Sequence, residues 1–303
     1  MATETIEAIE VPGADVITSA GRETYAGKEG PWRVVRITLR YLLMTVLAVI
    51  VLFPIYITVV NSLLTPEQIA ARPPTFFPTD PQWDTYKTAF TDGNMDRYLV
   101  NSFIVASLIT VGQIVTSVMA AYAFTFLRFP FRTVLFIAFI ATLMVPFEAL
   151  ILINRATMVR LDWINSYQAL VVPFLATGFG AFLLRQAFLQ VPKDLKDAAE
   201  LDGYGHWKFM TRVVVPLTRP AIAALGVFSF LQAWNQYLWP LLVTDDESHR
   251  TVQIGLKQLT TTSVEGFNIT VAGTVIAVVP IFVLLLVFQK YIIRGLTAGA
   301  VKG

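Results

Sequence analysis

The sequence predicts an all-α integral membrane protein with six transmembrane helices. Three observations lead to this prediction. First, 55% of the 303 residues are hydrophobic, only 15% are charged and the mean hydropathy is +0.61, which is too apolar for a water-soluble domain of this length. Second, six apolar runs reach the length of about 20 helical residues that a membrane crossing needs. Third, Lys and Arg are unevenly distributed between the connections.

Residues 1–40 are mixed and polar, and they lack a short apolar core followed by a small-residue cleavage site. This pattern predicts a cytoplasmic amino-terminal tail rather than a cleaved signal peptide. The sequence leaves the degree of order in this tail open. A second, shorter cytoplasmic tail is expected at residues 293–303.

The transmembrane domain is predicted to occupy residues 41–292. Its apolar runs lie at about 41–62, 98–126, 133–153, 167–190, 220–243 and 269–292. The gap between the first two runs is rich in turn formers, such as Arg72-Pro73-Pro74. We therefore expect an ordered loop outside the membrane there, not a seventh span.

The basic residues indicate the topology. Sixteen of the 23 Lys and Arg residues lie in the two tails, in the connection after the second span and in the region 185–219, whereas seven lie in the alternate connections. Because cytoplasmic connections carry the excess of Lys and Arg, both termini should be cytoplasmic. No Lys or Arg stands in mid-span, which argues against an Arg-rich voltage sensor.

The composition also excludes several kinds of chemistry. The chain has no cysteine, and its two histidines, His206 and His249, have no second histidine at metal-ligand spacing. No Gly-x-x-x-x-Gly-Lys-Ser/Thr phosphate loop occurs. We therefore expect no catalytic residue, no metal site and no cofactor in this chain, and the pI of 8.8 does not indicate nucleic-acid binding.

The longest cytoplasmic connection, residues 191–219, is predicted to form two short helices. Pro192 suits the start of the first helix, and Gly203 can take the left-handed conformation that ends it. Leu195, Ala198, Ala199 and Asp202 should share one face of that helix, where small side chains allow another surface to approach. From this pattern alone, an amphipathic loop lying on lipid headgroups is an alternative.

The run Asp197-Ala198-Ala199-Glu200-Leu201-Asp202-Gly203, followed by Pro216, resembles the EAA loop of ABC-importer permeases. Asp197 stands where that family usually has Glu, a change that keeps the charge. Phe53-Pro54, Asn101-Ser102, Trp234-Asn235 and the last nine residues resemble the maltose-type carbohydrate permeases. Within that group, the runs 128–130, 143–148 and 234–242 resemble the second (E-type) permease of sn-glycerol-3-phosphate and glycerophosphodiester importers.

The resemblance implies a multi-pass subunit of a bacterial inner membrane that pairs with a second permease as a heterodimer. It also implies two ATPase subunits, which bind ATP and Mg, and an extracytoplasmic substrate-binding protein. The expected ATPase-coupling residues are those that match the EAA loop: Asp197, Ala198, Ala199, Glu200, Asp202, Gly203 and Pro216.

Two groups of polar residues are candidates for the substrate pathway, because polar side chains within lipid are costly. Glu148 follows Pro146 in the outer half of the third span, where it could instead pair with Arg155. The second group should share one face of the fifth span, where the amides could alternatively serve only to bond neighbouring helices. Its members are Gln232, Asn235, Gln236 and Trp239.

The predicted function is that of a permease forming half of a translocation pathway for glycerol-3-phosphate or glycerophosphodiesters such as glycerophosphocholine. Glu148 should repel a phosphate, which favours a zwitterion whose cationic end an acid can hold. A permease for a sugar or oligosaccharide of the maltose/trehalose type is the alternative. A self-sufficient secondary transporter would need its own coupling-ion site and commonly two related halves, and we find no internal repeat.

Overall fold

The computed structural model describes residues 31–260 and 266–297. Most of the predicted amino-terminal tail and the last six residues lie outside these ranges. The chain divides into two compact units at the Pro54–Ile55 junction, inside the first helix, and all later helices belong to the second unit.

No β-strand occurs within residues 31–260 and 266–297. The helices are α1 (Pro31–Leu63), α2 (Pro66–Ala70), α3 (Asp84–Lys87), η1 (Thr88–Asp92), α4 (Met95–Phe126), α5 (Arg132–Ala141), η2 (Thr142–Met144), α6 (Phe147–Arg160), α7 (Tyr167–Val171), η3 (Val172–Phe174), α8 (Gly178–Phe188), α9 (Lys193–Leu201), α10 (His206–Phe209), η4 (Met210–Val214), α11 (Val215–Leu217), α12 (Arg219–Trp234), α13 (Leu238–Val243), α14 (Val252–Leu259) and α15 (Phe267–Thr297). The turns η1 and η4 are π-helical, and η2 and η3 are 3-10 helices.

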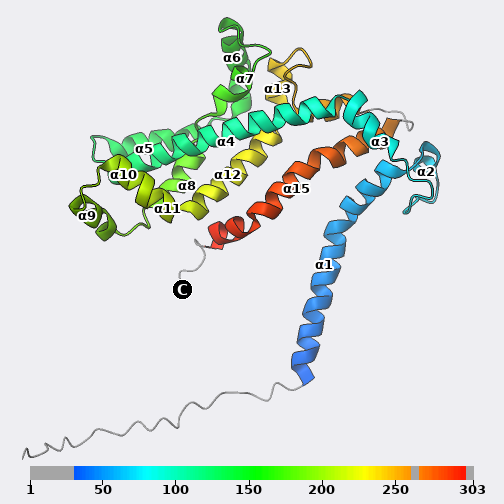
Figure 1. The fold of residues 1–303 in the computed structure, drawn as a ribbon, viewed down its shortest axis with the longest axis horizontal. Helices are drawn as coiled ribbons and strands as arrows, with labels where there is room; N and C mark the ends of the chain where they lie inside the picture. Colours follow the sequence, from blue (N-terminus) through cyan, green and yellow to red (C-terminus); the bar gives the residue numbers. More distant parts are fainter. Residues whose placement is uncertain (1–30, 261–265, 298–303) are drawn as a thin grey trace, which may run out of the picture. The chain divides into compact units, whose positions relative to one another are not determined.

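Four helices of the second unit, α4, α8, α12 and α15, run side by side (Figure 1). Helix α4 packs against both α8 and α12, and α12 packs against α15. One cluster of buried side chains, which includes Ile109 and Trp234, joins α4 to α6, α7 and α12–α15. A second cluster, which includes Tyr122 and Phe188, joins the other end of α4 to α8–α10, η4 and α12. Each end of the bundle therefore has its own apolar core.

All six predicted apolar runs are helical, although three of them are interrupted. Val34–Leu63, Met95–Phe126 and Phe267–Lys290 are each long and apolar enough to cross a membrane as single helices. The third run is bent by 93° between Arg132–Met144 and Phe147–Arg160, and the fourth by 45° between Tyr167–Phe174 and Gly178–Phe188. How these segments divide into membrane spans stays a prediction.

The bend in the third run has a local cause. Pro146 lacks the N–H that would continue the helical ladder, and its ring disfavours helical backbone at Val145, which is extended with φ −86° and ψ 112°. The third run therefore consists of two helices, and α6 leaves the first part at nearly a right angle.

The loop after α1 is ordered, as predicted. Thr65 and Gln68 form a capping box at the start of α2, in which each side chain bonds the backbone N–H of the other residue. The Ser62 hydroxyl lies 2.6 Å from the Tyr86 hydroxyl, and the Asn268 amide donates to the Leu64 carbonyl at 3.1 Å. These contacts join the end of α1 to α3 and to the start of α15.

Candidate coupling loop and translocation pathway

The first helix of the predicted coupling loop is α9. Pro192 is its N-cap residue, with ψ 138°, and Lys196 forms an ion pair with Glu200 one turn later at 3.3 Å. Such an i, i+4 pair contributes only a few tenths of a kcal/mol to a surface helix. The sequence therefore starts this helix where predicted, but local interactions alone do not make it stable.

The end of α9 is a Schellman motif. Gly203 has φ +73°, so it takes the left-handed conformation that the sequence predicted. The Tyr204 N–H donates to the Ala199 carbonyl at 2.8 Å, and the Gly203 N–H donates to the Glu200 carbonyl at 3.1 Å. These bonds satisfy two of the last carbonyls of the helix and turn the chain towards α10.

Aromatic contacts attach this loop to the bundle. The Tyr122 hydroxyl of α4 lies 3.0 Å from Nδ1 of His206 at the start of α10. Phe209 packs edge-on against Phe126 with ring centroids 5.4 Å apart, and Phe126 also contacts the buried Phe188 of α8. These contacts join the loop to the ends of α4 and α8.

The predicted coupling residues divide into two groups. Ala199 is buried against the bundle, and Pro216 is half-buried in α11, just before an 80° bend into α12. The others are exposed and lie together on α9 and its C-terminal turn: Asp197, Ala198, Glu200, Asp202 and Gly203. Of the four residues expected to share one face of this helix, Ala199 is buried, whereas Leu195, Ala198 and Asp202 are exposed, and the approach of another surface to them stays a prediction.

Sequence reasoning missed two exposed apolar side chains on the loop. Leu201 is 90% exposed and Trp207 is 70% exposed. A single exposed apolar side chain is common on a protein surface, so these two residues point to a docking surface only in combination with the other features of the loop. The signal was present in the sequence, since Leu201 stands between the two acids Glu200 and Asp202.

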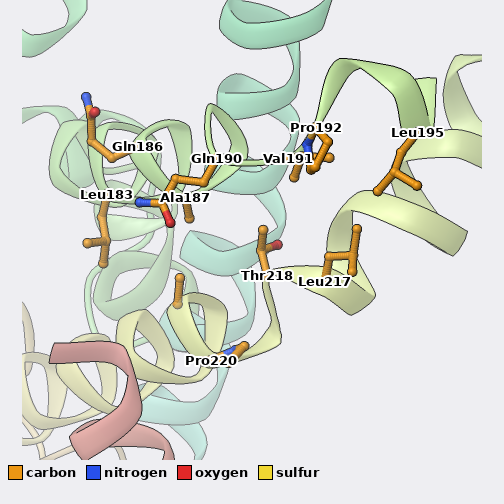
Figure 2. A pocket seen from close by; sticks show the side chains of 11 residues that line it. Leu183, Gln186, Ala187, Gln190, Val191, Pro192, Leu195, Leu217, Thr218 and Pro220 are labelled. Carbon is orange, nitrogen blue, oxygen red and sulfur yellow. The ribbon is translucent and has the colours of Figure 1, made fainter. Parts of the chain in front are cut away.

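A cavity of about 530 Å³ lies beside the loop, between the end of α8 and the α11–α12 bend. Figure 2 shows Leu183, Ala187 and Gln190 on the α8 side and Leu217, Thr218 and Pro220 on the opposite side. The side chain of Leu195 closes the α9 end. This space separates α9 from the start of α12.

The fifth predicted span contains a break. Helix α12 ends at Trp234 and α13 begins at Leu238. Pro240 would clash with the Gln236 carbonyl in a continuous helix and has no N–H to donate to it. The Asn235 side chain donates to the Leu231 carbonyl at 2.8 Å and accepts from Gln253 at 3.3 Å.

Because of this break, the predicted polar stripe is not a single helical face. Gln232 and Asn235 are exposed, and Gln236 is half-buried with its Oε1 atom unpaired in the described part of the chain. Trp239 is only 2% exposed, and its indole N–H donates to the Ala169 carbonyl at 2.9 Å. Placing Trp239 with the three amides was wrong, since α13 turns it into the core.

Glu148 lies in the first turn of α6 and is exposed. It forms no ion pair within residues 31–260 and 266–297. Arg155 instead donates from Nε to the Leu242 carbonyl at 2.9 Å, which links α6 to α13. The alternative in which Glu148 pairs with Arg155 is therefore contradicted.

The opposite end of the bundle from the coupling loop is organised by Asn101, which is 3% exposed. Its amide donates to the carbonyls of Ser248 and Arg250, both at 2.9 Å, and its oxygen accepts from Tyr167 at 2.7 Å. Asn101 thereby ties α4, α7 and the α13–α14 connection together. In that connection, hydrogen bonds from the Ser248 side chain and backbone hold the pKa of the Asp246 carboxyl below its usual range.

With this geometry established, comparison with known proteins decides the family. Residues 112–298 match the family described as "Binding-protein-dependent transport system inner membrane component". The chain belongs to this family. It is accordingly a multi-pass permease of an ABC importer in the inner membrane, and a non-catalytic transport subunit.

Curated relatives of this permease are similar along most of its length. It is 37% identical over 257 residues to the sn-glycerol-3-phosphate transport system permease protein UgpE of Brucella abortus (strain 2308), covering 82% of this chain and 91% of the relative. It is 38% identical to the UgpE protein of Agrobacterium fabrum (strain C58 / ATCC 33970), covering 84% and 94%. The UgpE protein of Yersinia pestis bv. Antiqua (strain Antiqua) is 34% identical, with the same coverage.

The permease fold also matches a solved structure. A chain of a bacterial ABC transporter that imports the acidic polysaccharide alginate superimposes with a TM-score of 0.75 at 21% identity, covering 86% of this permease and 96% of that chain. This likeness confirms the fold class predicted from the sequence. Within residues 31–260 and 266–297, the permease has no group of three His, Asp or Glu side chains that could hold a metal ion.

Proposed function

We propose that this permease forms half of the translocation pathway of an importer for sn-glycerol-3-phosphate or glycerophosphodiesters such as glycerophosphocholine. The observation that supports the substrate is the identity of 34–38% to several sn-glycerol-3-phosphate permeases, over more than four fifths of the chain. The runs 128–130, 143–148 and 234–242 carried the same resemblance in the sequence.

The exposed polar groups favour the diester within this substrate class. Glu148 has no basic partner in the described ranges, so its charge is free to repel a phosphate monoester or to attract a cationic end. A zwitterion such as glycerophosphocholine presents both signs of charge. Asn235 and Gln236, at the break between α12 and α13, offer amides of the kind that discontinuous membrane helices present to substrates.

The proposed assembly contains a second permease, two ATPase subunits and an extracytoplasmic binding protein. A structure of the bacterial alginate ABC transporter in complex with a periplasmic protein shows such a component bound in a related assembly. The proposed orientation places α9–α11 and both termini in the cytoplasm, because most Lys and Arg residues lie in the connections on that side. Figure 1 shows α9, α10 and α11 together at one end of the bundle.

In this assembly, α9 and the turn after it form the surface that docks on an ATPase subunit. Asp197, Glu200 and Asp202 supply negative charge around the exposed Leu201. An exposed apolar side chain ringed by polar groups is the typical arrangement of a small docking site. The buried side of the loop then transmits closure of the ATPase pair to α4 through Tyr122 and Phe126.

Uptake by the reconstituted importer tests the substrate. The permease, its partner subunits and the binding protein are placed in proteoliposomes that contain ATP, and entry of glycerol-3-phosphate, glycerophosphocholine and maltose is compared. We expect uptake of the first two and none of maltose. Uptake of maltose alone would contradict the proposal.

Substitution of Leu201 tests the docking surface. Leu201→Gln should lower ATPase activity stimulated by the binding protein by about tenfold, because loss of an apolar side chain that contributes to the centre of an interface costs about 1–2 kcal/mol. Leu161→Gln is the matched control. Leu161 is also an exposed leucine, at 48%, but it lies at the end of α6 and not on the loop. Equal activity of the two variants would show that Leu201 does not dock.

A further inference from the structure

A second cavity lies on the other side of the coupling loop. It has a volume of about 290 Å³ and lies between the α4–α5 turn and the α8–α9 connection. Its apolar lining consists of Phe126, Phe188, Leu189 and Val191. Docking of α9 on an ATPase subunit does not account for this cavity, because two of the basic side chains that line it belong to the α4–α5 turn.

Basic side chains are the most numerous charged groups in the lining of this cavity. Arg128 and Arg132 come from the α4–α5 turn, and Lys193 and Lys196 come from α9, whereas Asp197 is the one acid in the lining. A neighbouring depression shares Arg128 and Lys196 and adds His206 and Glu200. Positive charge from two separate elements therefore faces one space.

The partners of these side chains leave much of the charge uncompensated. Lys196 is paired with Glu200. An Arg132 Nη atom donates to the Leu127 carbonyl at 3.1 Å and, weakly, to the Thr125 carbonyl at 3.5 Å, which fixes the guanidinium without neutralising it. Within residues 31–260 and 266–297, neither the Arg128 side chain nor the Lys193 side chain forms a hydrogen bond or ion pair.

A polar atom in the cavity lining also lacks a partner. The Oγ1 atom of Thr125 is buried, and it forms no hydrogen bond in the described part of the chain. Buried hydroxyl groups are nearly always bonded. An unpaired hydroxyl beside uncompensated cations is the arrangement expected where a ligand supplies negatively charged oxygen atoms.

The position of the cavity indicates which kind of ligand supplies those oxygen atoms. The α4–α5 turn connects two apolar helices, so it lies at the level of the lipid headgroups in the proposed orientation. Phe131, between the two arginines of the turn, is 75% exposed with φ +59°, a backbone conformation that a bulky residue seldom takes. An apolar aromatic side chain beside basic residues matches the composition of segments that lie at a membrane surface.

We propose that this cavity binds the phosphate of an anionic phospholipid on the cytoplasmic leaflet. The headgroup bridges the α4–α5 turn and α9, so it restrains the coupling loop against the end of α4. Coupling between the ATPase and the pathway then depends on anionic lipid. The proposal rests on the orientation given under the proposed function, but not on the transported substrate.

Retention of lipid by the purified importer tests the site. The complete importer is exchanged into nanodiscs of phosphatidylcholine with phosphatidylglycerol added, then extracted, and the phosphatidylglycerol molecules that remain bound are counted by native mass spectrometry. The double substitution of Arg128→Gln and Lys193→Gln should weaken retention roughly 30-fold, because each basic side chain near an anionic surface contributes about a fivefold factor. Neither change removes a side-chain hydrogen bond or ion pair among the described residues.

Arg212→Gln is the matched control. Arg212 is an exposed basic residue of η4 that does not line the cavity, and its loss should change retention by less than twofold. Equal retention by the double variant, the control and the unmodified importer would overturn the proposal. Because lipid is counted without substrate, failure of glycerol-3-phosphate uptake would leave this result unaffected.

A second arm separates a lipid from a free anion. ATPase activity stimulated by the binding protein is measured in discs of phosphatidylcholine alone, in discs with phosphatidylglycerol, and in phosphatidylcholine discs with inorganic phosphate added. We expect a severalfold rise with phosphatidylglycerol, which the double variant loses, and no rise with inorganic phosphate. An equal rise with inorganic phosphate would assign the cavity to a free phosphate and overturn the lipid proposal.

Discussion

Tyr122 and His206 lie 84 residues apart in the chain, yet the tyrosine hydroxyl is 3.0 Å from the Nδ1 atom of the histidine. Tyr122 belongs to α4 and is 5% exposed, whereas His206 begins the second helix of the coupling loop. This bond is the polar part of an otherwise apolar attachment between the loop and the bundle.

Tyr122→Phe should therefore weaken coupling without removing the ring contacts. Loss of one hydrogen bond of this kind costs about 0.5–1.5 kcal/mol, so ATPase activity stimulated by the binding protein should fall severalfold while the basal activity is kept. Tyr204→Phe is the control, because the Tyr204 hydroxyl has no hydrogen-bond partner among the described residues. Identical stimulation in both variants would remove the bond from the coupling route.

Gly203→Ser should impair the turn after α9. The added Cβ meets no atom within 4 Å, so the cost comes from the positive φ of +73° and amounts to about 1–2 kcal/mol. Gly205→Ser is a matched control, since its Cβ also finds open space but its φ is −74°. We expect stimulated ATPase activity to fall for Gly203→Ser only, and a similar fall in both variants would contradict the conformational explanation.

The local features of the loop could be predicted because each depends on a few neighbouring residues. Pro192 and Gly203 determine where α9 begins and ends, whatever the rest of the chain does. The helical conformation of the six apolar runs could be predicted as well. The contact between Tyr122 and His206 could not be predicted, because it depends on how α4 and α10 pack.

The incorrect predictions for the candidate pathway residues have a similar physical cause. In a fifth span that is one ideal helix, Asn235 and Trp239 are one turn apart on the same face. The break that Pro240 favours rotates α13, so Trp239 points towards Ala169 instead. Likewise, spacing alone allowed Glu148 to pair with Arg155, but Arg155 bonds the Leu242 carbonyl on a different helix.

Asn101→Ala should destabilise the permease strongly. Asn101 is buried and makes three side-chain hydrogen bonds, so its loss leaves two carbonyls and the Tyr167 hydroxyl without their partner. We expect a loss of about 2–4 kcal/mol, against about 1 kcal/mol for Ser102→Ala, which removes only the bond to the Val252 N–H. The thermal unfolding midpoints of the two variants in detergent test which substitution is more destabilising. A lower midpoint for Ser102→Ala than for Asn101→Ala would refute the structural role of Asn101.

Glu148→Gln should change substrate preference rather than stability. The substitution keeps the size of the side chain and its hydrogen-bonding capacity but removes a charge that has no ion-pair partner within residues 31–260 and 266–297. If Glu148 attracts the choline group, uptake of glycerophosphocholine should fall more than uptake of glycerol-3-phosphate. The Coulomb energy at close range is ~1–4 kcal/mol, depending on the local dielectric, and water in the pathway reduces it further, so the difference should be modest.

Two further variants separate this electrostatic effect from damage to the fold. Asp162→Asn removes a different acid, which follows α6, and should leave the ratio of the two uptake rates unchanged. The substitution should also keep the fold, because asparagine tolerates the φ of +56° at that position. Arg155→Gln should weaken the contact of α6 with α13 and lower both uptake rates together, since Arg155 bonds Leu242 and not Glu148. If Glu148→Gln instead lowers both rates equally, as Arg155→Gln does, the carboxylate serves the fold and does not contact the substrate.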